Sequence, residues 1–116
     1  MKNDKVFINH IRDEVDYIIR ETKQIDYNDL MCNETLKKAL IRSLEIIGEA
    51  TKNLSEDFRD KYAEVKWKEL AGLRDKLIHF YFGVDWDTVG DVIKNKIPQL
   101  EKNIQNILKD IEKNEI

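Results

Sequence analysis

The stretch LRDKLIHFY at residues 73–81 combines the apolar repeat of a helix with four polar or reactive side chains. The apolar positions recur at steps of three or four residues, which is the spacing of the buried face of an amphipathic helix; they are Leu70, Leu73, Leu77, Phe80 and Tyr81. An arginine, an aspartate, one of the two histidines and a tyrosine fall within the same two turns. The pattern predicts a helix from about Trp67 to Phe82 that ends at Gly83.

The same helical period continues on both sides of this stretch. Three further stripes are visible: Ile8, Ile11, Val15, Ile18, Thr22 and Ile25; Leu36, Leu40, Leu44, Ile47, Thr51 and Leu54; and Val89, Ile93, Ile97, Leu100, Ile104, Ile107 and Ile111. Pro98 predicts a break or kink just before it. No strand-like alternation is present, so we expect one all-α domain over residues 1–116, an antiparallel bundle of four main helices plus short helical segments.

Polar residues in front of the stripes mark the expected helix starts. Asp4 stands where the N-cap of the first long helix would lie, and the second long helix is expected to start near Asn33. Ser55 would cap a short helix that reaches about Tyr62. A short helical turn is expected to open at Asn28 or Asp29. The last helical segment would open at Asp85 or Asp87.

Composition limits the classes of function. The 116 residues carry 37% charged side chains and a net charge of −3, which argues against a broad basic surface that holds nucleic acid by charge alone. The single Cys32 forms no internal disulfide and suits a reducing cytoplasm. No apolar run resembles a signal peptide or approaches the roughly 20 residues that span a bilayer. We therefore expect a cytoplasmic protein with no membrane partner.

The face of the 67–82 helix that carries His79 admits two interpretations. On a helical wheel Arg74 and Tyr81 border the apolar stripe, whereas His79 lies opposite and one turn after Asp75. In the first interpretation this face meets solvent, and Asp75 and His79 form an ordinary surface pair. In the second it contacts another subunit, because the small Ala71 and Gly72 permit close approach and Phe82 would otherwise be a large exposed aromatic.

An arginine beside a histidine, without a cluster of metal ligands, suits phosphodiester cleavage that needs no metal and no cofactor. Histidine transfers protons near neutral pH, and the arginine fork binds phosphate and stabilises developing charge. RNA would supply its own nucleophile, the 2′-hydroxyl. A metal site is not favoured, because His10 is distant in sequence and Cys32 has no ligand at metal-binding spacing.

Three blocks of the sequence resemble the toxins of the HEPN/MNT toxin–antitoxin pairs, the HepT-like ribonucleases. They are RSLEIIGEA at 42–50, WKELAGLRDKLIH at 67–79 and FYFGVD at 80–85, in matching order and spacing. The resemblance implies a HEPN-like bundle that dimerises, with Arg74 and His79 as the catalytic pair of an Arg-x4-His-x-Tyr motif. It also implies a minimal nucleotidyltransferase antitoxin that attaches AMP to Tyr81, as in a type VII-like system. Asp75 would support His79.

The chain departs from the family pattern at two positions. Asparagine is frequent in the family where this chain has Ser43, and a bulky aromatic is common where it has Gly90. In the family, dimerisation brings two Arg–His motifs together in a cleft. Glu45 and Glu49 on the second helix either line this cleft or form salt bridges with Arg42 and Lys52; the salt-bridge interpretation is favoured.

Two non-enzymatic interpretations remain beside the ribonuclease. The chain could be a non-catalytic helical binding or regulatory subunit of a nucleotidyltransferase complex, or a structural four-helix adaptor. The intact Arg74/His79 pair favours the enzyme.

Overall fold

The computed structural model describes residues 2–79 and 83–115, with Lys2, Ile78 and His79 described by their backbone alone. The elements in chain order are α1 (Lys2–Thr22), α2 (Tyr27–Met31), α3 (Glu34–Lys52), α4 (Glu56–Lys61), α5 (Trp67–Ala71), α6 (Leu73–Leu77), β1 (Ile78–His79), β2 (Gly83–Val84), α7 (Trp86–Asp91), a π-helical turn (Val92–Lys96) and α8 (Ile97–Asn114).

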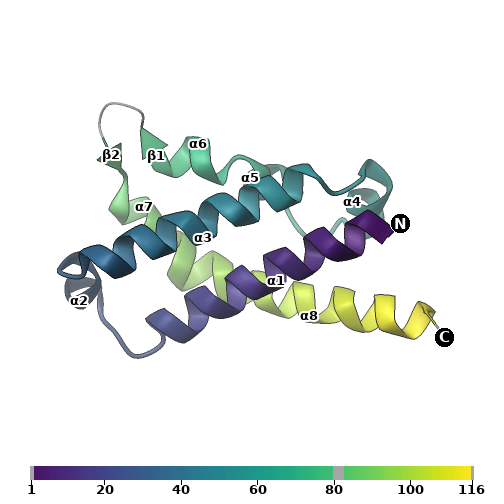
Figure 1. The fold of residues 1–116 in the computed structure, drawn as a ribbon, viewed down its shortest axis with the longest axis horizontal. Helices are drawn as coiled ribbons and strands as arrows, with labels where there is room; N and C mark the ends of the chain where they lie inside the picture. The colour runs from purple at the N-terminus through teal and green to yellow at the C-terminus, as the bar shows by residue number, and fades with distance from the viewer. Residues whose placement is uncertain (1, 80–82, 116) are drawn as a thin grey trace.

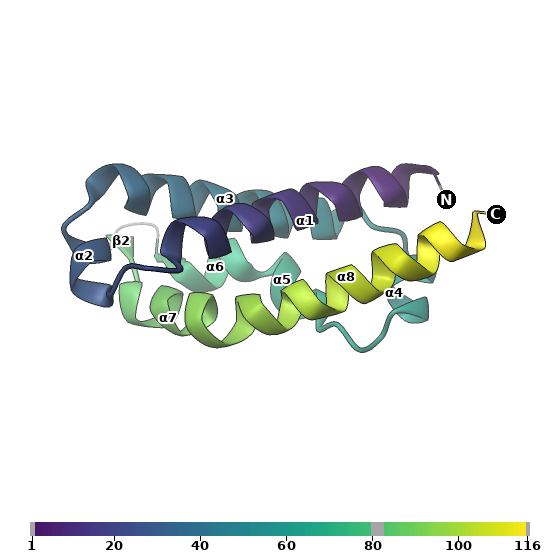
Figure 2. The ribbon, with the colours of Figure 1, turned by 90° about the horizontal axis from the view of Figure 1, so that it is seen from below.

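The long helices α1, α3 and α8 form the frame of an all-α bundle. Helix α1 packs along both α3 and α8, while α5 and α6 lie against the other side of α3 (Figure 1). Seen from below, α1 and α3 form one layer, and α5, α6, α7 and α8 lie beneath them (Figure 2). The expected helical bundle is therefore confirmed. No described helix is long and apolar enough to cross a membrane.

The apolar stripes predicted from the sequence form the core. Ile8, Ile11, Val15 and Ile18 of α1 are almost completely buried. So are the stripe residues Leu40, Leu44 and Ile47 of α3 and Ile97, Leu100, Ile104 and Ile107 of α8. Burial of these side chains is the main favourable contribution to the fold.

The cap predicted at Ser55 is found, and Asn33 caps the helix that was expected to start near it. Asn33 and Ser55 accept hydrogen bonds from the backbone amides of Leu36 and Phe58 and cap α3 and α4. Of the two candidates for the last segment, Asp85 is the cap of α7. The short α2 begins one or two residues before the expected turn, because Asp26 and Asp29 form a reciprocal capping box there.

The prediction that Asp4 caps the first helix is wrong. Helix α1 begins at Lys2, and Asp4 lies within its first turn, where it is 4% exposed. Its two carboxylate oxygens accept hydrogen bonds from the amide and the hydroxyl of Ser55, each at 2.7 Å. The carboxylate therefore joins α1 to the start of α4, and these bonds compensate its burial.

The prediction of one helix over residues 67–82 is also wrong. The helix is interrupted at Gly72, which ends α5, and α6 ends at Leu77. Ile78 and His79 then form β1, which pairs antiparallel with β2 in the register Ile78–Val84 and His79–Gly83. Residues 80–82 lie outside the described part of the chain.

The sequence of this segment explains the change from helix to strand. A β-branched residue and a run of aromatic residues follow Leu77 in the sequence IHFYF, and both types favour strands. Gly83 has a φ of +82°, a conformation that L side chains rarely adopt. Gly83 was expected to end a helix; it instead opens the second strand of a hairpin.

Pro98 disturbs the last helix without breaking it. The backbone widens into the π-helical turn Val92–Lys96 just before the proline, which stands in the first turn of α8.

The Tyr27 ring covers Gly90, where an added Cβ would lie 3.4 Å from the ring. The Tyr27 hydroxyl donates to Asp87 at 3.1 Å. An aromatic ring from α2 thus occupies the space beside Gly90.

Two contacts fix where α5 begins. The indole Nε1 of Trp67 donates to the backbone oxygen of Tyr62 at 3.0 Å, and the Tyr62 hydroxyl donates to Asp110 of α8 at 2.6 Å. Burial, followed by the hydrogen bond to Asp110 and its charge, raises the pKa of Tyr62 to about 12. The tyrosine therefore remains a hydrogen-bond donor throughout the physiological pH range.

Gly48 lets α5 approach α3 closely. A Cβ at Gly48 would lie 3.3 Å from the backbone oxygen of Leu70 and 3.5 Å from that of Ala71. By contrast, a Cβ at Gly72 would make ordinary contacts of 3.6 and 3.8 Å with Lys68 and Glu69. The absence of a side chain is therefore needed for the helix approach at Gly48 but not for the local contacts at Gly72.

We predict that Gly48→Val lowers the free energy of unfolding by about 1–3 kcal/mol, because the added side chain must displace the backbone of α5. The matched variant Gly72→Ala should change it by less than about 1 kcal/mol. Urea unfolding followed by circular dichroism measures both. Equal stability of the two variants would show that the close approach at Gly48 does not constrain the fold.

Candidate active site

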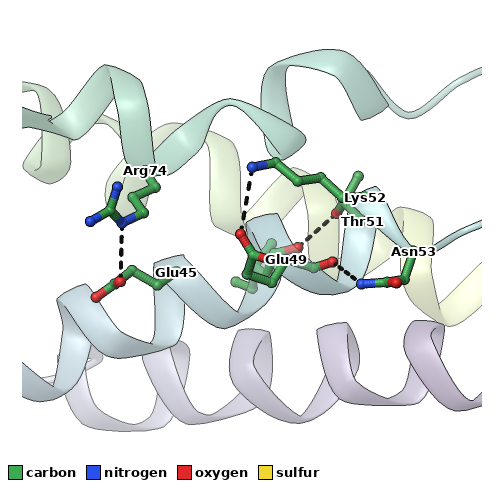
Figure 3. A network of polar contacts seen from close by, with 7 residues as sticks. Glu45, Glu49, Thr51, Lys52, Asn53 and Arg74 are labelled. Carbon is green, nitrogen blue, oxygen red and sulfur yellow. Dashed lines mark hydrogen bonds and ion pairs between the residues drawn. The ribbon is translucent and has the colours of Figure 1, made fainter.

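Arg74 lies on α6 and presents its guanidinium group to solvent. Its side chain is 53% exposed, and its Nε donates to Oε2 of Glu45 on α3 at 3.3 Å. The terminal nitrogens of the guanidinium point away from the glutamate (Figure 3). The arginine is therefore held on one side, while its outer edge faces away from the contact.

The two glutamates of α3 have different partners. Glu49 forms an ion pair with Lys52 at 3.5 Å, as the favoured sequence interpretation expected. Glu45 was expected to pair with Arg42, and that expectation is wrong: its carboxylate, 28% exposed on the side chain, contacts Arg74 instead. The reason is geometric, because α6 lies beside α3 and Arg74 faces Glu45 there (Figure 3).

The structure changes the argument that linked Asp75 to His79. The side chains were expected to meet one turn apart on a helix, but the helix ends at Leu77 and the backbone of His79 belongs to β1. The prediction that Asp75 and His79 lie one turn apart on the same helix is therefore wrong. Asp75 is exposed on α6. Its supporting role stays a prediction without that geometry.

The remaining sequence-predicted residues follow directly along the chain. His79 is placed by its backbone pairing with Gly83, so it stands at the start of the hairpin that α6 leads into. Tyr81 and Phe82 lie outside the described residues. Ala71 and Gly72 are half-buried at the junction of α5 and α6. Both the solvent and the subunit interpretation of this face therefore stay open.

The chemistry that the described residues offer is anion recognition. A guanidinium presents a planar fork of donors that matches two phosphate oxygens, and this fork needs a fixed orientation to act. Arg74 is hydrogen-bonded to Glu45 through Nε alone, and about half of its side chain is exposed. Among the side chains that the structure describes, those of residues 3–77 and 83–115, no group of three histidine, cysteine or carboxylate side chains gathers at metal-binding distance.

Sequence reasoning missed the Glu45–Arg74 contact. The two residues are 29 positions apart, and nothing in their local patterns connects them. Gly48, one turn after Glu45, was the available signal, because a glycine inside a helix often marks the close approach of another backbone.

The chain is an all-α bundle in which the short helix α6, which carries Arg74, leads directly into a two-stranded hairpin that contains His79. The chain matches the HepT-like family, described as "Ribonuclease HepT-like", over residues 11–107. That match covers most of the sequence, and this chain belongs to the HepT-like ribonuclease family.

Curated relatives agree with this membership. A protein of Caldanaerobacter subterraneus subsp. tengcongensis named "Putative RNase" is 46% identical over 93% of this chain and 96% of its own length. A Methanocaldococcus jannaschii protein with the same description is 48% identical over 93% of each chain. A Thermococcus cleftensis protein named "Probable ribonuclease HepT" is 38% identical over 93% of this chain and 98% of its own. No solved structure gives a significant match.

Proposed function

We propose that this protein is the toxin of a type VII-like HEPN/MNT toxin–antitoxin pair and that it cleaves RNA without a metal ion. The observation that carries the proposal is Arg74: its guanidinium is oriented by α3, exposed, and five residues before His79 in a chain of the HepT-like ribonuclease family. The names of the relatives support ribonuclease activity.

The reaction follows from the chemistry of the two residues. The 2′-hydroxyl of RNA attacks the adjacent phosphorus, the bond to the 5′-oxygen of the next nucleotide breaks, and a 2′,3′-cyclic phosphate forms. His79 transfers the proton that leaves the 2′-hydroxyl or the one that the 5′-oxygen takes up. Arg74 binds the non-bridging oxygens and stabilises the charge that develops on them.

A second copy of the chain would complete this site. A single copy offers one histidine at the proposed site, His79, whereas the reaction needs one proton removed and another delivered. Two copies that meet at the α5–α6 junction would bring two Arg74/His79 pairs together. The small, half-buried Ala71 and Gly72 at that junction support the arrangement.

The partner in this proposal is a minimal nucleotidyltransferase that acts on Tyr81. The tyrosine oxygen would attack the α-phosphorus of ATP, and pyrophosphate would leave with the transfer of AMP. The new phosphate would lie two residues from His79 and compete with the RNA phosphate for Arg74. Modification would therefore neutralise the toxin at its own active site.

Cleavage should depend on the two motif residues and survive chelation. We expect His79→Ala and Arg74→Lys each to lower the rate of RNA cleavage in EDTA by about 100-fold or more, because one loses the proton-transfer group and the other the bidentate fork. His10→Ala and Arg42→Lys are the matched controls and should keep the wild-type rate. Equal activity of all four variants would reject the site, and loss of wild-type activity in EDTA would reject metal independence.

The chain should sediment as a dimer at micromolar concentration. We expect Gly72→Leu to weaken the dimer, because a large side chain would obstruct the approach of a second helix, while circular dichroism should show a folded chain. Gly72→Ala should have a smaller effect. A wild-type species of only 13.8 kDa would contradict the two-copy site.

Tyr81 should carry the modification. Mass spectrometry of the chain incubated with ATP and the partner should find one or more AMP units on the peptide that holds Tyr81. Tyr81→Phe should abolish the adduct and leave the chain toxic in the presence of the partner. An adduct on Tyr17, Tyr27 or Tyr62, or neutralisation without any adduct, would show that control works differently.

A further inference from the structure

Glu45 is the residue that the guanidinium of Arg74 contacts. The two side chains come from different helices, α3 and α6, and the Nε–Oε2 distance is 3.3 Å. No other ion pair or side-chain hydrogen bond of Arg74 is found in the described part of the chain. The glutamate is the less exposed partner, with 28% against 53% of the side chain accessible.

We propose that Glu45 is a positioning residue for RNA cleavage, which acts by holding Nε of Arg74 so that the Nη1/Nη2 edge faces the phosphate. This inference rests on the proposed function and deepens it. An arginine can offer a phosphate either its Nε/Nη edge or its Nη1/Nη2 edge. With Nε donated to Glu45, the terminal edge is the one left, and Figure 3 shows it directed away from α3.

The geometry favours positioning over a stabilising role for the ion pair. More than half of the Arg74 side chain is exposed, and ion pairs in such surroundings contribute little to stability. Orientation of a reacting group, by contrast, affects the rate strongly, because a small misplacement lowers the population of productive complexes. Glu45 should therefore matter more for turnover than for folding.

The close approach of α5 to α3 supports this role. Leu70 and Ala71, whose backbone oxygens lie against Gly48, precede Arg74 by four and three positions in the chain. Glu45 lies almost one turn before Gly48 on α3. The same packing therefore holds close together the backbone segments that carry Glu45 and Arg74.

Steady-state kinetics of RNA cleavage separates positioning from other roles. We expect Glu45→Ala to lower kcat by about tenfold or more with little change in KM, since phosphate still meets a charged but disordered arginine. Glu45→Gln should retain most of the activity, because its amide oxygen still accepts from Nε. Glu49→Gln is the matched control on the same helix, and it should behave as wild type.

A second measurement reports the contact without catalysis. In nuclear magnetic resonance spectra, solvent exchange of the Arg74 Nε–H should be slow in wild type and in Glu45→Gln, and fast in Glu45→Ala. Thermal unfolding of Glu45→Ala should be close to wild type, which separates positioning from a loss of fold.

The outcomes distinguish this inference from the proposed function. Wild-type kcat in Glu45→Ala, or a rate above wild type, would overturn positioning; the second result would mean that the carboxylate opposes substrate phosphate. If Glu45→Ala keeps the wild-type kcat while Arg74→Lys abolishes cleavage, only the positioning role of Glu45 is rejected and the proposed ribonuclease function stands. If wild type cleaves no RNA, the proposed function fails, and fast exchange at Arg74 Nε in wild type would reject the orienting contact itself.

Discussion

The close approach of α5 to α3 at Gly48 is the constraint on which the site depends. Without a side chain at Gly48, the backbone oxygens of Leu70 and Ala71 come close to α3. The same approach places α6 beside α3, where Arg74 contacts Glu45. Trp67 fixes the beginning of this segment through its hydrogen bond to the backbone of Tyr62. A side chain at position 48 would act on the arginine through the whole α5–α6 segment.

Local electrostatics, and not the overall charge, would give this protein its contact with RNA. A chain of net charge −3 offers no general attraction to a polyanion. One guanidinium can still bind one phosphate, because its fork of donors matches two phosphate oxygens. Pairing with Glu45 also compensates part of the arginine charge, which suits binding at one phosphodiester better than along a nucleic acid backbone.

The helical period of the apolar residues predicted the long helices α1, α3 and α8. It failed over residues 67–82, where local sequence preferences oppose a continuous helix. The stripes of α1, α3 and α8 are long, so their burial outweighs any single residue, and the sequence predicted them well. Over residues 67–82 the same period was present, but Gly72 interrupts the helix and the β-branched and aromatic residues after Leu77 favour a strand. The positions of Asp4 and Glu45 depend on partners 51 and 29 residues away, which no local pattern contains.

In the mechanism proposed for this protein, the RNA is cleaved by its own 2′-hydroxyl, and Arg74 receives the phosphate. The most direct measurement is the chemistry of the RNA ends produced by the purified chain in EDTA. We expect 2′,3′-cyclic phosphate at the 3′ ends, and no cleavage where a single 2′-deoxynucleotide replaces the nucleotide 5′ to the cut. Ends that carry a 3′-hydroxyl, or cleavage that tolerates the deoxynucleotide, would contradict it.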